Sequence, residues 1–231
     1  MIKPLKLYIT NKTYSSWSLR AWLLMRELAI PFEEVLVPLE DAGNHQNFRR
    51  FCPTGTVPCL HDGDRVVWDS LGITEYLAEL YPGVWPVDVR ARAWARCAAA
   101  EIHSGFQHLR NACSMHCTVR VRLHAVSDVL QRDLDRIDAL WCDGLARHGG
   151  PFLAGAKFCA VDAFYAPVAV RLQTFQLALS APAMAYARRL LELPAMRAWF
   201  EAALAERARD PGHDADTLGA GTLVEDFRAR P

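Results

Sequence analysis

The sequence predicts an α+β fold, in which a small mixed unit with the element order βαβ–ββα precedes an all-helical half. The first 80 residues alternate between short strand patterns and helical patterns. Two prolines and a glycine then interrupt both periods at residues 81–86, and no strand pattern is found after them. We therefore expect domains at residues 1–81 and 88–209, joined by a linker at 82–87. Residues 210–231 are rich in Gly, Asp and Ala and predict a loose C-terminal tail.

The elements of the mixed unit follow from their local patterns. Residues 5–10 predict a strand and residues 19–28 a helix, which Ile30 and Pro31 end. Residues 32–39 alternate like a second strand. Asp62-Gly63-Asp64 lies between two apolar runs, a strong signal for a hairpin turn, and residues 71–80 predict the helix that follows it.

The second half contains helical patterns of different composition. Residues 89–112 are rich in Ala and Arg and predict one long helix. Residues 120–147 predict a second helix with one apolar face. Residues 160–179 predict a third, mostly apolar helix, Pro182 and Pro194 bracket a fourth, and residues 196–207 form a fifth.

Composition restricts the classes of function. Net charge is zero, hydrophobic content is 52% and charged content 23%, which is ordinary for a soluble globular protein and gives no reason to expect nucleic acid as a partner. No apolar run approaches the length of a membrane span, and the N-terminus lacks the shape of a signal peptide. Seven cysteines without tight spacing suit free thiols in the cytoplasm.

One segment of the helical half is crowded with potential metal ligands. It contains no paired Cys-x-x-Cys and no His-Glu-x-x-His, so we expect core and pocket wall there and no metal. The residues concerned are His103, His108, Cys113, His116 and Cys117.

Three hydroxyl groups lie where the first strand pattern turns into a helix. Ser15, Ser16 and Ser18 stand between the strand at 5–10 and the helix at 19–28. The start of a helix exposes unpaired backbone N–H groups and carries a partial positive charge. A hydroxyl donor there can hold an anion, including a thiolate. The alternative is that one serine serves only as the N-cap of the helix.

Two further pieces of the mixed unit point to the same site. Pro58 opens a strand, where it cannot donate to the ladder, and a cis bond after Val57 would leave the Val57 backbone free to pair with an extended peptide. Ser70 precedes a helix and can offer its N–H to a carboxylate, while Asp69 beside it can pair with an amine. Together with the serines, these groups suit a small peptide with a free amino acid head and a central thiol.

At this point the chain resembles the soluble glutathione transferases over about residues 4–207. The resemblance implies a thioredoxin-like N-terminal domain, an all-helical C-terminal domain, a homodimer, and glutathione as co-substrate. The matching pieces are Ser15-Ser16-Trp17-Ser18-Leu19-Arg20, Pro53-Thr54-Gly55-Thr56-Val57-Pro58, Asp69-Ser70-Leu71-Gly72-Ile73-Thr74-Glu75-Tyr76-Leu77, and, in the helical half, Gly150-Pro151-Phe152-Leu153-Ala154-Gly155 with Ala160-Val161-Asp162-Ala163.

The resemblance also implies roles for individual residues. Ser15 would donate a hydrogen bond to the glutathione sulfur, with Ser16 as the alternative or second donor. Val57 would pair with the cysteinyl backbone, and Asp69 and Ser70 would hold the γ-glutamyl head. The full expected glutathione site is Ser15, Ser16, Trp17, Thr56, Val57, Pro58, Asp69 and Ser70, and the expected electrophile pocket is Trp17, Phe106, Arg110 and Met115.

Two serines followed four residues later by Arg20 most resemble the zeta class, although Trp17 stands where that class has cysteine. The expected function is conjugation of glutathione, activated as its thiolate, to a small hydrophobic electrophile. Glutathione-dependent cis–trans isomerisation of the maleylacetoacetate type and non-catalytic binding of glutathione conjugates or other ligands remain as alternatives. Two further departures from the family are Thr56, in place of a longer polar residue, and Cys159, in place of a Ser or Thr helix cap, which leaves Asp162 to cap alone.

Overall fold

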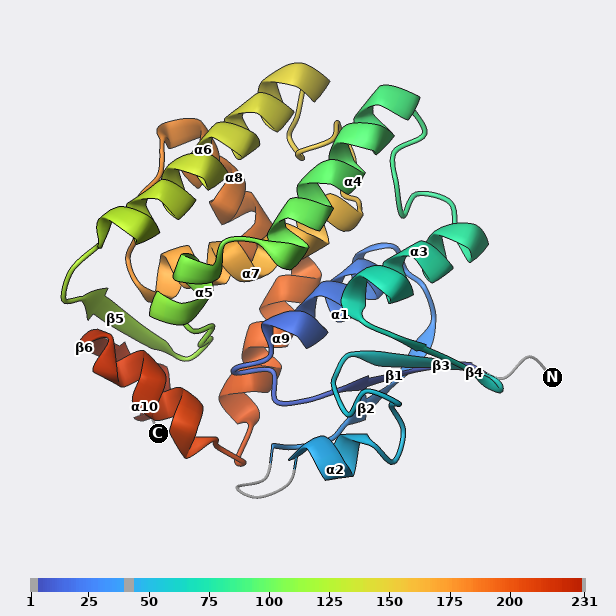
Figure 1. Ribbon diagram of the computed structural model, residues 1–231, viewed down its shortest axis with the longest axis horizontal. Helices are drawn as coiled ribbons and strands as arrows, with labels where there is room; N and C mark the ends of the chain where they lie inside the picture. The colour runs from blue at the N-terminus through green and yellow to red at the C-terminus, as the bar shows by residue number, and fades with distance from the viewer. Residues whose placement is uncertain (1–3, 40–43, 230–231) are drawn as a thin grey trace.

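The computed structural model describes residues 4–39 and 44–229, and it begins with a four-stranded sheet flanked by helices (Figure 1). The elements are β1 (Leu5–Ile9), α1 (Ser16–Glu27), β2 (Phe32–Leu36), α2 (Asn44–Phe48), β3 (Cys59–Asp62), β4 (Arg65–Trp68) and α3 (Ser70–Leu80). The strand order is β2-β1-β3-β4, with β2 parallel to β1 and the β3–β4 hairpin antiparallel. This arrangement confirms the predicted βαβ–ββα unit.

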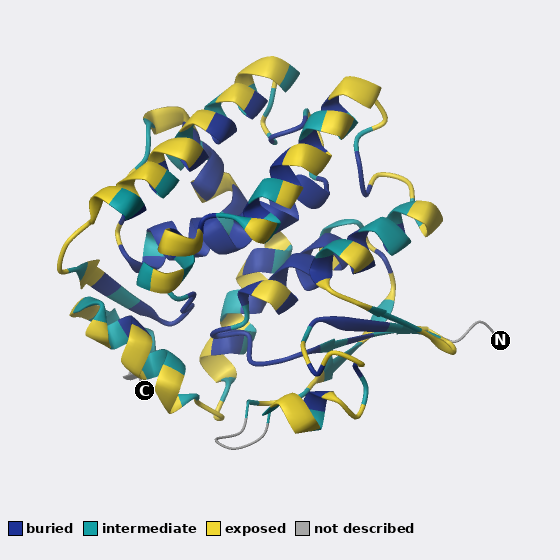
Figure 2. Cartoon of the chain, viewed as in Figure 1, coloured by how far each residue is buried: buried dark blue, intermediate teal, exposed yellow. Residues whose placement is uncertain are grey.

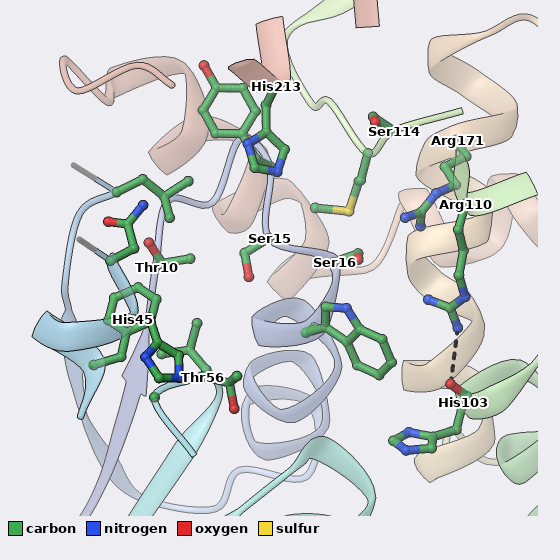
Figure 3. A pocket seen from close by; sticks show the side chains of 18 of the residues that line it. Thr10, Ser15, Ser16, His45, Thr56, His103, Arg110, Ser114, Arg171 and His213 are labelled. Carbon is green, nitrogen blue, oxygen red and sulfur yellow. Dashed lines mark hydrogen bonds between the residues drawn. The ribbon is translucent and has the colours of Figure 1, made fainter. Parts of the chain in front are cut away.

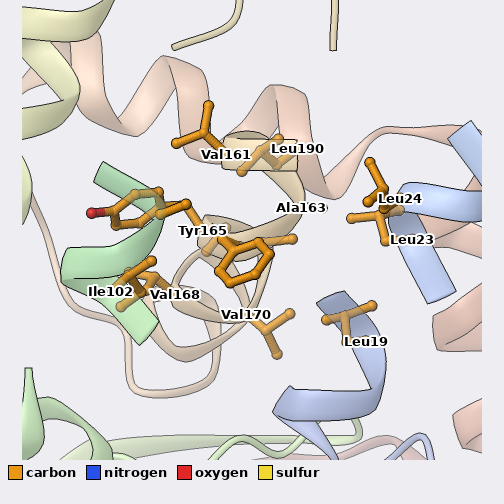
Figure 4. Packing of buried hydrophobic residues seen from close by; sticks show 14 of the residues in the cluster. Leu19, Leu23, Leu24, Ile102, Val161, Ala163, Tyr165, Val168, Val170 and Leu190 are labelled. Atoms are coloured by element: carbon orange, nitrogen blue, oxygen red, sulfur yellow. The ribbon is translucent and has the colours of Figure 1, made fainter. Parts of the chain in front are cut away.

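The helical half packs around one buried helix. Its main helices are α4 (Val89–Ser104), α5 (Gln107–Ala112), α6 (Asp128–His148), α7 (Ala160–Thr174), α8 (Ala181–Leu191) and α9 (Pro194–Ala205). Helix α7 is buried almost all round, as Figure 2 shows, because it packs against α1, α4 and α8. Leu19, Leu23 and Leu24 of α1 face this helix, so the core is continuous between the sheet unit and the helical half (Figure 4). The predicted α+β fold class is therefore confirmed.

The predicted long helix at 89–112 is wrong, because the chain breaks into α4 and α5. Gly105 is extended at φ −105° and ψ −165°, and Phe106 adopts a left-handed conformation at φ 56°. Arg110 then reaches back across the break and donates to the carbonyls of Gly105, at 3.0 Å, and of Ile102. These bonds satisfy carbonyls that the broken helix would otherwise leave without a partner.

The expectation that the second half lacks strands is also wrong. Strand β5 (Val119–Leu123) pairs antiparallel with β6 (Gly221–Asp226), so the second helix begins at residue 128 instead of 120. Val119 and Val121 are buried while Arg120 between them is half-buried, which is the two-residue period of a strand. The partner strand lies about one hundred residues away in sequence, so no local pattern reveals the pairing.

The C-terminal segment is ordered, which corrects the predicted loose tail. It forms α10 (Pro211–Gly219), β6 and a short 3₁₀ turn, η1 (Phe227–Ala229). Asp214 of α10 accepts hydrogen bonds from Tyr14 Oη and from Arg228, and its Oδ1 lies 2.9 Å from Nε2 of the buried His116. These contacts tie α10 and η1 to the turn before α1 and to the segment before β5.

Candidate functional site

A cavity of about 520 Å³ lies where the N-terminal end of α1 meets the helical half. Segments from both ends and the middle of the chain line it, and Figure 3 shows their side chains converging on one space. The lining residues are Thr10, Tyr14, Ser15, Ser16, Trp17, Leu39, Asn44, His45, Phe48, Gly55, Thr56, Val57, His103, Gln107, Arg110, Ser114, Met115, Arg171 and His213.

Both predicted sulfur donors line this cavity, but their hydroxyl groups have different surroundings. Ser15 is the N-cap of α1: its Oγ accepts from the Ser18 N–H at 3.2 Å and lies 2.8 Å from Ser18 Oγ. Ser18 Oγ in turn accepts from the Thr10 N–H at 3.3 Å. Within the part of the chain that the structure describes, the Ser16 hydroxyl makes no hydrogen bond. Ser15 is thus both a cap and a cavity residue, whereas the Ser16 hydroxyl is free for a ligand.

The loop before β3 brings a second backbone segment to the cavity. Thr56 and Val57 line the cavity, and the Val57–Pro58 peptide bond is cis. Pro58 itself is buried and does not line the cavity. Thr56 Oγ1 lies 2.7 Å from Thr54 Oγ1. No backbone hydrogen bond of Val57 occurs within residues 4–39 and 44–229, so its N–H and carbonyl are available to an extended peptide.

Asp69 and Ser70 lie at the start of α3, and neither of them lines the cavity. Asp69 has φ 69° and caps the helix by accepting from the Leu71 N–H at 2.7 Å. Its other carboxylate oxygen is 3.5 Å from Nε2 of His103, which does line the cavity. Burial lowers the pKa of His103 even though Asp69 opposes the shift, so this imidazole is neutral at neutral pH. The Ser70 hydroxyl is buried and has no partner in the described ranges.

The electrophile pocket predicted from the sequence is assembled in part. Trp17, Arg110 and Met115 line the cavity. Phe106 does not: it is buried at the left-handed turn between α4 and α5, where its ring packs into the core. Its placement follows from the helix break that the sequence pattern did not reveal.

Several cavity residues were not predicted, because they come from segments without a local signal. His213 belongs to α10, in the segment expected to be a loose tail, and its Nδ1 lies 3.0 Å from Asp210 Oδ1. Arg171 lies on α7, among apolar residues that predict only core. His45 lies on α2 against Gly55, whose φ of 67° and lack of a side chain permit the contact. Gln107 begins α5, and Ser114 follows the end of this helix.

Most of the cysteines and histidines that are crowded between residues 103 and 117 lie in the core or in the cavity wall. His116 is fully buried against Asp214, and Cys113 and Cys117 are buried thiols whose pKa values burial raises to about 12. Among the described residues, no group of three or more His, Cys, Asp or Glu side chains could hold a metal ion. In the same part of the chain, no helix has the length and apolar character to cross a membrane.

Comparison with known proteins places the chain among relatives of one kind. Residues 14–80 match the family model "Glutathione S-transferase, N-terminal domain". A zeta-class glutathione S-transferase of Euphorbia esula is 30% identical over 169 residues, covering 71% of this chain and 75% of that protein. A dichloromethane dehalogenase of Methylorubrum extorquens is 43% identical over 61 residues, but the match spans only 21% of its length. A solved glutathione transferase homolog from Burkholderia GL BGR1, with bound glutathione, shares the fold at a TM-score of 0.67 and 23% identity, covering 89% of this chain and 100% of that one.

Proposed function

Because this chain belongs to the glutathione S-transferase family, we propose that it binds glutathione beside Ser15 and conjugates it, through its sulfur, to a small electrophile. The observation that carries the proposal is the meeting of Ser15 and Ser16, at the N-terminal end of α1, with the unpaired Val57 backbone in one cavity. The helix end and a hydroxyl donor favour an anion at that point, and the Val57 backbone can pair with the cysteinyl residue that carries the thiol.

The chemistry follows from the charge on sulfur. A free thiol has a pKa near 8.5, so only a small fraction is thiolate at neutral pH. A hydroxyl that donates to the sulfur stabilises the anion, and lowering the thiol pKa by about two units corresponds to roughly 2.7 kcal/mol. The thiolate then forms a carbon–sulfur bond to the electrophile. The serine itself forms no covalent bond.

Ser15 can serve as this donor without losing its role as a cap. In the structure its hydroxyl proton is directed to Ser18 Oγ. A hydroxyl can rotate, so Ser18 can donate to Ser15 Oγ instead, which frees the Ser15 proton for sulfur. Ser16 needs no such exchange. Both serines are therefore retained as candidates, with Ser15 preferred because it lies at the cap of the helix.

Asp69 and Ser70 would hold the γ-glutamyl head of glutathione. Burial lowers the pKa of the neighbouring His103, so this imidazole, 3.5 Å from the Asp69 carboxylate, is neutral and forms no ion pair with it at neutral pH. An ammonium group of the ligand can supply a cationic partner. The buried Ser70 hydroxyl without a partner would accept or donate one further bond to the same head group.

The quaternary state and location form part of the same proposal. We infer a cytoplasmic homodimer, in keeping with seven free cysteines and with large apolar side chains left exposed at the end of β4, at the end of α3 and in the linker before α4. Trp68 is 43% exposed, Leu80 48% and Val87 91%. Sedimentation equilibrium would measure the molecular mass in solution, and a monomer at micromolar concentration would refute the dimer.

The decisive experiment is turnover of a panel of electrophiles, each with and without glutathione. We expect glutathione-dependent conjugation of at least one aryl or alkyl halide. Isomerisation of a cis enone with no net consumption of glutathione would point instead to the isomerase reaction. Tight binding of glutathione without turnover of any compound would refute catalysis and favour a carrier.

A further inference from the structure

We propose that Arg110 and Arg171 form an anion-binding subsite for the second substrate, so that the electrophile of this enzyme carries a carboxylate. The inference rests on the proposed transferase function and names the class of its second substrate. It replaces the plainly hydrophobic electrophile that the sequence suggests with an acid.

The two arginines occupy the part of the cavity away from the α2 side. Arg110 comes from α5 and Arg171 from α7, and in Figure 3 they lie across Ser16 from His45 and Thr56. The side chain of Trp17 lies with them: the guanidinium carbons of Arg20 and Arg110 are 4.3 and 4.9 Å from the centroid of its ring. A ligand that meets the thiolate near Ser16 would therefore meet these cations as well.

The charge of the cavity is unbalanced. Two guanidinium groups, those of Arg110 and Arg171, line the cavity, and no aspartate or glutamate of the described chain does. Arg171 donates from Nε to the Cys113 carbonyl at 2.8 Å and from Nη1 to the Pro167 carbonyl at 3.2 Å. Arg110 donates only to the carbonyls that close the α4–α5 break. Across residues 4–39 and 44–229, neither guanidinium forms a salt bridge with a carboxylate.

A third guanidinium increases the excess of positive charge. Arg20 is buried, and its Nε and Nη1 have no partner within the described residues. Burial, together with the charges of Arg110 and Arg171, lowers the pKa of Arg20, and burial followed by the charge of Arg110 lowers that of Arg171 to about 10. The charge of Asp69 opposes the shift of Arg20 only in part, and a bound anion would further offset the cost of burying these like charges.

The free donors are held in fixed directions. Nη1 of Arg110 and Nη2 of Arg171 make no hydrogen bond to any part of the protein that the structure describes, while the remaining nitrogens are clamped by backbone carbonyls. Clamped guanidinium groups lose little freedom when they bind an anion, and their planar geometry matches a carboxylate. The subsite is therefore built before the ligand arrives.

A matched pair of substrates tests the proposal: 4-chloro-3,5-dinitrobenzoate and its methyl ester. In both reactions the glutathione thiolate attacks the carbon that carries chlorine. The carbon–sulfur bond forms, the carbon–chlorine bond breaks, chloride leaves with the electron pair, and the thiol proton goes to solvent. We expect wild type to prefer the acid in kcat/KM at saturating glutathione, after subtraction of the uncatalysed rate.

Arg110→Met should lower kcat/KM for the acid about 10- to 100-fold, as expected for loss of a charge-assisted hydrogen bond, and change that for the ester less than about threefold. Arg110→Lys should restore part of the preference. Arg120→Met is the matched control, because Arg120 is half-buried, donates to the Val119 carbonyl at 2.8 Å and lies over the Phe227 ring, but does not line the cavity. It should leave the ratio of acid to ester unchanged.

Binding measurements keep the test independent of turnover. With the protein saturated by S-methylglutathione, calorimetry should show 3,5-dinitrobenzoate binding to wild type and to Arg120→Met, with at least tenfold weaker binding to Arg110→Met. Equal affinities for wild type and Arg110→Met would overturn the subsite. A second result would also overturn the subsite: Arg110→Met raises the Kd of glutathione and lowers kcat/KM equally for the acid and the ester. The arginine would then hold a carboxylate of glutathione and not one of the electrophile. Failure of the protein to conjugate either halide while 3,5-dinitrobenzoate still binds through Arg110 would count against the proposed transferase function and not against the subsite.

Discussion

Replacing Ser15 with alanine separates two roles that the structure assigns to one hydroxyl. As the N-cap of α1, Ser15 Oγ accepts from the Ser18 N–H, and loss of such a cap typically costs about 1 kcal/mol. For a chain of 231 residues this corresponds to a fall in Tm of roughly 2–4 °C. As a donor to sulfur, the same hydroxyl would contribute roughly 1.5–3 kcal/mol, or about 10- to 150-fold in rate at pH 6.5.

The pH dependence distinguishes the catalytic role from the structural one. Without the donor, the pKa of bound thiol rises toward its ordinary value near 8.5, so the thiolate fraction at pH 6.5 falls. Above the raised pKa the thiol ionises unaided, and part of the lost rate should return by about pH 9. A loss caused only by a damaged helix start would be similar at both pH values. Glutathione affinity should change less than turnover, because Asp69, Ser70 and Val57 would still hold the peptide.

Ser16→Ala is the matched control, since the Ser16 hydroxyl has no bond to α1 in the described chain and its removal should leave Tm unchanged. Thiolate absorbance near 240 nm (roughly where thiolates, unlike thiols, absorb) would be titrated in wild type and both variants, together with the rate. If Ser15→Ala alters only Tm while Ser16→Ala shifts the titration and the rate, the donor is Ser16. If neither variant shifts them, serine does not activate the thiol.

Three further changes test the surrounding framework. Asp69→Asn keeps an oxygen that can cap α3 but removes the charge, so it should weaken glutathione binding by about 1–3 kcal/mol in calorimetry; unchanged affinity would remove Asp69 from the site. Burial raises the pKa of Asp162 to about 6, above the usual value near 4, so the folded state holds this proton more tightly than the unfolded state does. The unfolding free energy of wild type relative to Asp162→Asn should therefore fall as pH rises from about 4 to 6, by at most roughly 3 kcal/mol. Denaturant titrations that show the opposite slope would contradict the assignment. Asp214→Ala removes the carboxylate shared by Tyr14, His116 and Arg228, and should lower the free energy of unfolding by about 3 kcal/mol. Amide hydrogen exchange in residues 211–226 should become faster than in wild type. Unchanged exchange rates would show that the segment does not depend on this carboxylate.

Helix ends and tight turns are the features that the local sequence was sufficient to predict. The Ser15 cap of α1 and the Asp69 cap of α3 depend on side chains within four residues of the backbone they satisfy, and the turn at Gly63 depends on the positive φ of that glycine. Asp162 is similar: its carboxylate accepts from the Cys159 N–H at 2.9 Å, so it caps α7 where cysteine is a poor cap. Such signals are visible in the sequence because the interacting groups are adjacent in the chain.

The C-terminal segment shows where local sequence failed. Composition predicted a loose tail, because residues 210–231 offer few apolar groups with a helical period. Their order depends instead on contacts with residues far away in the chain. Asp214 meets His116 and Tyr14, and β6 meets β5. None of these contacts produces a periodic pattern in the sequence of residues 210–231, so the pattern could not predict them.

The sequence by itself therefore determined the mixed N-terminal unit, the mainly helical second half, the serine turn and the two segments at Val57 and Asp69 that we propose to bind glutathione, since these depend on caps, turns and periodicities of neighbouring residues. Arg110 was expected in the pocket, but only the tertiary structure decided that Arg171 and His213 share that cavity with Ser15, and that Phe106 does not line it. Arg171 lies in α7, whose apolar pattern predicts only core. The position of Arg110 depends on the helix break at Phe106, which the composition of residues 89–112 does not predict. The net charge of the chain is zero, yet the cavity is cationic, because folding gathers arginines there and leaves their counterions elsewhere.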